Sequence, residues 1–213
     1  MIRCVAFDFD NTLVRSETLK RRSFYDVVDA SLHDALDELL TRRPLPDRFQ
    51  TFALLAEHAG VTDQGEAWAK EYSDLADQRI AVCPEVLGAG DTIRALAARD
   101  VHMAIISDTP QEPLEKAVSA RPWAGQIDAV HGKPTAKADH LAEIAAEQGV
   151  DPRQMVMVGD RDGDRAAAET VGARFVQIDF DDPGVGADDR PDGHGWPVLV
   201  DLTGLVQVID RFE

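Results

Sequence analysis

The sequence has only two cysteines, Cys4 and Cys83, among 213 residues. Such a pair does not make the closely spaced framework that stabilises small secreted domains. The first residues also lack the pattern of a secretory leader and lead directly into an apolar run. We therefore expect a cytoplasmic protein whose two thiols are reduced.

Long hydrophobic runs and positive charge are also scarce. No apolar run approaches the roughly 20 residues that a membrane-spanning helix needs, so we expect no membrane partner. The 22 Lys and Arg residues against 39 Asp and Glu residues give a formal net charge of −17 at pH 7. This charge repels nucleic-acid phosphates and anionic membranes, which excludes both as expected partners. It also opposes an anionic small substrate unless cations reverse the field within the site.

The composition otherwise fits a globular protein, with 44% hydrophobic and 29% charged residues. Apolar runs alternate with helical patterns along most of the chain, which favours an α/β fold with a parallel sheet covered on both faces. After the first run, which begins at Val5, the expected strands are 101–106, 127–130, 155–158, 174–178 and 198–200. A closing helix is expected at 202–212, and residues 179–197 read as an exposed acidic loop.

Residues 18–80 interrupt this alternation, because they contain helical patterns and no strand pattern. We expect helices at about 18–40, 47–60 and 62–79. The sequence therefore predicts two domains: an α/β core formed by residues 1–16 and 82–213, and a helical cap at 17–81.

Two carboxylates, Asp8 and Asp10, stand two residues apart where the first apolar run ends, and Thr12 follows them. Open α/β sheets bind their ligands at the carboxyl edge of the strands. Two neighbouring carboxylates are costly unless a cation such as Mg²⁺ lies between them. A carboxylate can also attack phosphorus as a nucleophile. The alternative is a strand followed by an Asx turn with Thr12 as a cap.

Three further polar groups fall at the same kind of position. Ser107 follows an apolar strand, Lys137 opens a helix, and Asp160 and Asp164 follow the run that ends at Val158. If the runs form neighbouring parallel strands, these side chains belong to one edge of the sheet.

Taken together, these residues resemble the four motifs of the haloacid dehalogenase-like superfamily of phosphohydrolases, in order and over essentially the whole chain. Asp8 to Thr12 matches the first motif and Ser107 the second. Gly159 to Asp164 matches the fourth, G-D-x-x-x-D. The resemblance implies a Rossmann-like core of three layers with a parallel sheet, and an α-helical cap inserted after the first strand.

The resemblance also implies the chemistry. Asp8 would attack phosphorus and become an aspartyl-phosphate, while Asp10 would protonate the leaving oxygen and then activate water. The implied Mg²⁺ ligands are Asp8, Asp10 through its carbonyl, and Asp160, with Asp164 in support. The implied phosphate-binding residues are Thr12, Ser107, Asp108 and a lysine.

Two lysines compete for the third motif. Lys133, in Gly132-Lys133-Pro134, looks like a form found in sugar-phosphate and phosphoglycolate phosphatases. Lys137 looks like the form in which the lysine starts a helix, and its distance to Gly149 resembles that in phosphoserine phosphatases. We favour Lys137 because Lys133 lies further back than the first form allows.

These expectations describe a Mg²⁺-dependent phosphatase for a small phosphorylated metabolite, acting as a monomer or homodimer. The enzymatic alternatives are a phosphoryl transferase, a mutase or a phosphonate hydrolase on the same core. A catalytically idle binding protein is the alternative from another class, and the intact motif acids argue against it. A dehalogenase is disfavoured, because family members that displace halide lack an acid at the position of Asp10.

One basic cluster stands out in this acidic chain. It consists of Arg15, Lys20, Arg21 and Arg22. These cations either draw an anionic substrate towards the site or form an ordinary helix face paired with Asp26 or Glu17.

Overall fold

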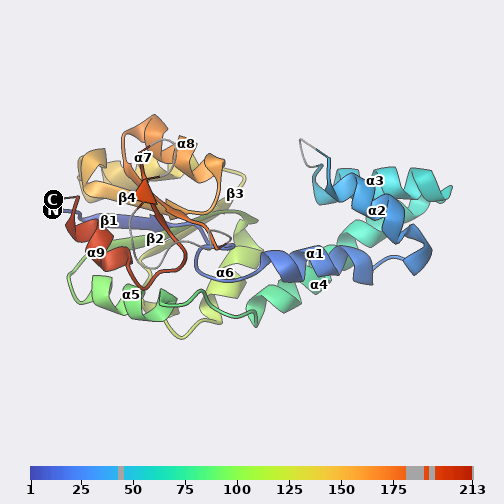
Figure 1. The fold of residues 1–213 in the computed structure, drawn as a ribbon, viewed down its shortest axis with the longest axis horizontal. Coiled ribbons are helices and arrows are strands. Elements are labelled where there is room, and N and C mark those ends of the chain that lie inside the picture. Colours follow the sequence, from blue (N-terminus) through green and yellow to red (C-terminus); the bar gives the residue numbers. More distant parts are fainter. Residues whose placement is uncertain (43–45, 181–189, 192–194, 213) are drawn as a thin grey trace. The chain divides into compact units, whose positions relative to one another are not determined.

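A computed structural model describes residues 1–42, 46–180, 190–191 and 195–212. The chain forms two compact units (Figure 1). The first comprises Met1–Arg15 and Pro84–Glu213, and the second is Ser16–Cys83. Each unit is described by itself below.

The first unit contains a seven-stranded sheet in the order β3-β2-β1-β4-β5-β7-β6, within the part of the chain that the structure describes. The strands are β1 (Cys4–Phe7), β2 (His102–Pro110), β3 (Ala129–Lys133), β4 (Met155–Gly159), β5 (Arg174–Ile178), β6 (Arg190–Pro191) and β7 (Pro197–Leu199). All neighbours pair in parallel except β6, which runs antiparallel to β7. Strand β1, which lies between β2 and β4, is fully buried, as its uninterrupted apolar run predicts.

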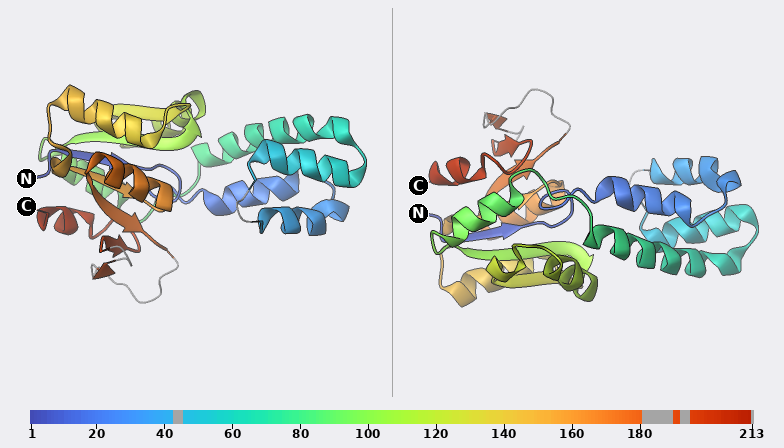
Figure 2. Two further views of the ribbon diagram at one scale, coloured as in Figure 1. Left: turned by 90° about the horizontal axis from the view of Figure 1, so that it is seen from above. Right: turned by 90° about the horizontal axis from the view of Figure 1, so that it is seen from below.

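Helices cover both faces of this sheet. They are α5 (Ala89–Ala97), α6 (Gln111–Ser119), α7 (Lys137–Gln148), α8 (Asp162–Val171) and α9 (Leu205–Asp210). Helices α7 and α8 lie on one face, and α5 and α9 lie together on the other (Figures 1 and 2). Leu141 and Ile144 of α7 and Ala168 of α8 join Ala6 and Met157 of the sheet in one buried cluster. This confirms the predicted three-layer α/β fold.

The segment that precedes the helical unit and the segment that follows it pair with each other inside the first unit. The N–H of Arg15 donates to the carbonyl of Pro84 (2.9 Å), and that of Val86 donates to the carbonyl of Leu13 (2.9 Å). Val14 and Glu85 form an antiparallel bridge between these bonds. The chain thus leaves and re-enters the core at one hydrogen-bonded junction.

In the second unit, the described residues form only helices and turns. The helices are α1 (Glu17–Asp26), α2 (His33–Leu40), α3 (Arg48–Ala59) and α4 (Gly65–Ala81), with short 3₁₀ turns at Ala30–Leu32 and Thr62–Gln64. Phe24, Phe52 and Tyr72 form its aromatic centre, with ring centroids 4.2 to 5.8 Å apart. Helix α3 begins at a capping box of Asp47 and Gln50 and ends at Gly60, whose φ is 71°. These bounds agree with the helix expected at about 47–60.

The prediction of one helix over 18–40 is wrong. Asp29 is extended, with a ψ of 144°, and its side chain accepts a hydrogen bond from the N–H of Ser31 (2.9 Å). A short polar side chain that bonds to nearby backbone in this way competes with the helix. The apolar spacing continues across the break, so periodicity alone does not reveal it.

The end of the chain also differs from expectation. Most of the predicted loop 179–197 lies outside the described residues, but Arg190–Pro191 forms the edge strand β6. The closing helix is shorter than predicted, since α9 spans Leu205–Asp210. No helix in the described ranges is both long and apolar enough to cross a membrane.

Phe52→Ala should destabilise the helical unit strongly. Phe52 is fully buried at its aromatic centre, and truncating such a ring costs about 3–5 kcal/mol. Phe49→Ala is the matched control on the same helix, because Phe49 is 56% exposed and its loss should change stability by less than about 0.5 kcal/mol. Chemical denaturation of both variants measures the difference, and equal effects would contradict this account of the core.

Candidate active site

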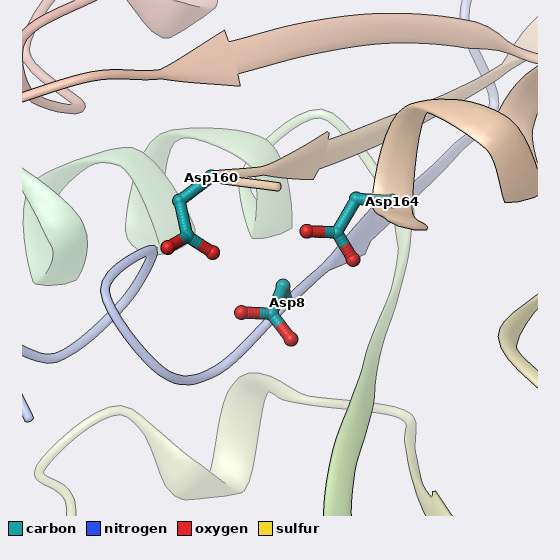
Figure 3. A group of neighbouring side chains, drawn as sticks. All are labelled: Asp8, Asp160 and Asp164. Carbon is teal, nitrogen blue, oxygen red and sulfur yellow. The ribbon is translucent and has the colours of Figure 1, made fainter. Parts of the chain in front are cut away.

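The carboxyl ends of β1 and β4 bring three carboxylates together (Figure 3). The parallel register pairs Phe7 with Val158, and the N–H of Asp8 donates to the carbonyl of Val158 (2.8 Å). Asp8 therefore emerges beside Asp160, which follows β4. Asp164 reaches the same place from the first turn of α8, and one carboxylate oxygen of each residue lies within 4.8 Å of the others.

The fourth motif holds Asp164 tightly. Its Oδ2 accepts a hydrogen bond from the N–H of Arg161 (3.1 Å), and the residue is 1% exposed. The N-terminus of α8 also favours a negative charge here. A Cβ atom on Gly159 would overlap the Asp164 carboxyl group, which explains why this motif needs glycine at that position.

A tight turn follows Asp8. Asn11 has a φ of 56°, a left-handed conformation that asparagine tolerates better than most residues. Its Nδ2 donates to Oδ2 of Asp160 (3.4 Å), a link between the first and fourth motifs that the sequence reading did not anticipate. Thr12 is fully buried, and its hydroxyl has no partner within the described structure.

Lys137, at the start of α7, reaches into the carboxylate cluster. Its Nζ lies 2.6 Å from Oδ1 of Asp8 and 2.5 Å from Oδ1 of Asp164. Burial acts to lower the pKa of Lys137, but the carboxylates of Asp8 and Asp164 outweigh it and hold that pKa above its usual value. The ammonium group is therefore charged.

Lys133 lies elsewhere, at an exposed position. Its Nζ is 3.2 Å from Oδ1 of Asp108, and the two side chains are 56% and 68% exposed. The structure thus brings Lys137 to the carboxylates and pairs Lys133 with Asp108, which was also predicted to bind phosphate.

Burial shifts the pKa values of two acids in this cluster. Burial raises the pKa of Asp8 well above its usual value; Lys137 opposes this shift, and the nearby acids Asp164 and Asp10 add to it. Burial likewise raises the pKa of Asp160 to about 6, against the influence of the Arg161 guanidinium. Such shifts are characteristic of functional sites.

The end of β2 supplies two hydroxyl groups. Ser107 is 2% exposed, and its Oγ accepts a hydrogen bond from the N–H of Thr109 (3.2 Å). The Thr109 hydroxyl in turn donates to Oδ2 of Asp10 (2.9 Å). The sequence reading missed Thr109, although its place two residues after Ser107 on a strand indicates that both side chains start on the same face.

Two residues of the basic cluster, Arg21 and Arg22, form ion pairs within the helical unit. Arg21 lies 3.9 Å from Asp37, and Arg22 lies 3.6 Å from Asp26 one turn later. These contacts support the interpretation of Arg21 and Arg22 as an ordinary helix face.

The sequence profile of the haloacid dehalogenase-like hydrolases matches residues 2–172. The chain belongs to this family. One relative of this haloacid dehalogenase-like hydrolase is a phosphoglycolate phosphatase from Shigella boydii serotype 4. It is 28% identical, and the alignment covers 84% of this chain and 82% of that protein.

Solved structures share the fold of this haloacid dehalogenase-like hydrolase at lower identity. A predicted phosphoglycolate phosphatase from Haemophilus somnus has a TM-score of 0.73 at 17% identity and covers 97% of each chain. A 2-haloacid dehalogenase from Pseudomonas syringae has a TM-score of 0.64 at 20% identity and covers 100% of each. Since a phosphatase and a dehalogenase share this fold, the activity has to be argued from the site.

Proposed function

We propose that this hydrolase is a Mg²⁺-dependent phosphatase that cleaves a small phosphomonoester through an aspartyl-phosphate on Asp8. The observation that carries the proposal is the contact of Lys137, whose side chain is only 11% exposed, with both Asp8 and Asp164 beside Asp160. An ammonium group held among carboxylates at the edge of a parallel sheet fits the binding of a phosphoryl group next to its nucleophile.

Each residue has a role that its surroundings support. Asp8 is fixed by its backbone bond to β4 and by Lys137, so its carboxylate is oriented to attack phosphorus. Lys137 and the buried hydroxyl of Ser107 would bind the phosphoryl oxygens and offset charge that develops during transfer. Asp10 would give its proton to the leaving oxygen and later take one from the attacking water.

The residues present fit a divalent cation. Asp160 Oδ1 is buried and has no hydrogen-bond partner in the described structure, and its neighbours Asp8 and Asp164 offer further hard oxygen ligands. Asp8, Asp160 and the Asp10 carbonyl would hold Mg²⁺, with Asp164 in support. When bound, the ion would neutralise phosphoryl oxygens and lower the repulsion between substrate and carboxylates.

The relatives indicate which substrate to test first. Because the Shigella relative is a phosphoglycolate phosphatase, we propose a small phosphorylated carboxylic acid, with 2-phosphoglycolate as the first compound. The test is phosphate release from a panel of phosphorylated metabolites with Mg²⁺. A mutase or transferase would consume ester without releasing stoichiometric phosphate, and an idle binding protein would release none.

Removing divalent metal should abolish turnover, and added Mg²⁺ should restore it. Mg²⁺ should also raise the thermal unfolding temperature, since a ligand that binds the folded state stabilises it. In Asp160→Asn, both the activity and this stabilisation should be reduced. The measurements are phosphate release and differential scanning calorimetry with EDTA and with Mg²⁺. Full activity in EDTA would contradict the metal requirement.

A further inference from the structure

An irregularity in β2 faces the proposed acid. The register of β2 with β3 pairs Ile106 with His131 and Pro110 with Lys133, so three residues of β2 lie opposite Gly132 alone. Extra residues of this kind form a bulge, which bends the strand and re-aims its side chains. Ser107 and Thr109 both belong to this bulge.

Two features of the neighbouring segments support the bulge. A Cβ on Gly132 would lie 2.6 Å from the carbonyl oxygen of Thr109 and 2.8 Å from Cα of Gln111, so the close approach of the two strands requires glycine. The Gln111 side chain accepts a hydrogen bond from the N–H of Gly132 (2.5 Å) and donates to the carbonyl of Val130 (2.8 Å). These hydrogen bonds link the first turn of α6 to β3.

The Thr109 side chain is well restrained at this position. It is β-branched, which limits its χ1 rotation, and it precedes Pro110, which favours extended backbone. Its N–H donates to Oγ of Ser107 (3.2 Å), and its hydroxyl donates to Oδ2 of Asp10 (2.9 Å). One residue therefore connects the proposed phosphate-binding hydroxyl with the proposed acid and base.

We propose that Thr109 is a positioning residue for Asp10, an inference that rests on the proposed phosphatase function. A hydroxyl that donates to Oδ2 stabilises the lone pairs on that oxygen and directs the catalytic proton to Oδ1. It also fixes the plane of the carboxyl group. Asp10 then presents one defined oxygen to the leaving group and afterwards to water.

The orientation of the Asp10 carboxyl group affects both chemical steps. In the first, a carboxylate oxygen of Asp8 bonds to phosphorus, the ester P–O bond breaks, and the leaving oxygen takes the proton of Asp10. In the second, water bonds to phosphorus, gives one proton to Asp10, and the bond between phosphorus and Asp8 breaks. Phosphate leaves, and both aspartates return to their starting states.

The test compares Thr109→Val, which keeps the shape and removes the hydroxyl, with Thr109→Ser, which keeps the hydroxyl. Thr170→Val is the matched control, because the Thr170 hydroxyl donates to the Ala166 carbonyl at an exposed site on α8 (2.7 Å). We would measure kcat/KM for 4-nitrophenyl phosphate, phenyl phosphate and an alkyl phosphate. These leaving groups need increasing help from an acid, and kcat/KM reports the first chemical step.

Thr109→Val should lose roughly tenfold or more on the alkyl ester, a fraction of the 10²- to 10⁴-fold that general acid catalysis contributes. It should lose little on 4-nitrophenyl phosphate. Thr109→Ser should recover most of the loss, and Thr170→Val should match the wild type on all three esters.

If Thr109→Val lost the same factor on every ester, or kept wild-type rates, the role of Thr109 would be overturned. The proposed phosphatase function would still stand in either case, as long as Asp8→Asn is inactive. A wild-type protein that cleaves none of the esters would overturn the proposed function and this inference with it. Thermal unfolding of each variant separates both outcomes from loss of fold.

Discussion

Asp8→Asn should abolish phosphatase turnover without unfolding the protein. The substitution removes the proposed nucleophile, and losses of this kind reach roughly 10⁴-fold or more. The fold should survive, because asparagine has the same shape and the change removes one of several crowded buried carboxylates. The measurements are phosphate release, trapping of a phosphorylated enzyme, and thermal unfolding.

Asp162→Asn provides the control for this experiment. Asp162 lies in the same first turn of α8 as Asp164, but its side chain is 94% exposed and pairs with Arg165 (2.8 Å). Its removal should change the rate by less than about twofold, in keeping with the small effects of surface substitutions. If Asp8→Asn turned over substrate like the wild type, the aspartyl-phosphate mechanism would be excluded.

Lys137→Ala should lower kcat by roughly a hundredfold or more, the scale of removing one preorganised electrostatic partner. Lys133→Ala should have a mild effect, because that ammonium group is exposed and paired with Asp108. Rates are compared at saturating substrate and Mg²⁺, with unfolding temperatures measured for both variants.

The stability measurement is needed because Lys137→Ala leaves Asp8 and Asp164 without their cation. Lys137→Met retains most of the buried side-chain volume and separates lost packing from lost charge. A large loss for Lys133→Ala with little effect at Lys137 would reassign the phosphate-binding lysine.

The fold was predictable from the sequence where the hydrophobic pattern and the residues at the ends of an element indicate the same structure. The run that forms β1 is apolar throughout and has no polar face, which is typical of a strand buried inside a parallel sheet. The cap at Asp47 and the stop at Gly60 likewise gave the ends of α3. At Asp29 these two indications disagree. The helical spacing of apolar residues continues, but the Asp29 side chain accepts a hydrogen bond from the N–H of Ser31 and the helix is interrupted there.

The site was predictable to the extent that it lies at strand ends. Asp8 and Asp160 meet because β1 and β4 are parallel neighbours in register, and motif spacing is enough to expect this. The catalytic roles of these residues stay predictions that the variants above test.

Other parts of the site depend on geometry that the sequence does not encode locally. Motif spacing favours Lys137 over Lys133, but the contact of Lys137 with Asp8 depends on where α7 starts relative to the sheet. The bond from Thr109 to Asp10 depends on a bulge that forms only when β3 lies beside β2. Patterns read along one segment contain no information on such a contact between segments.

The hydrogen-bonded junction at Arg15 and Pro84 has an evolutionary consequence. The two chain segments are hydrogen-bonded to each other before the helices begin. The ends of the inserted unit therefore stay side by side, whatever the length of the chain between them. Helices can be lengthened, exchanged or recombined beyond this point without shifting the register that aligns Asp8 with β4. One arrangement of the strand ends is thus compatible with insertions of different length and sequence.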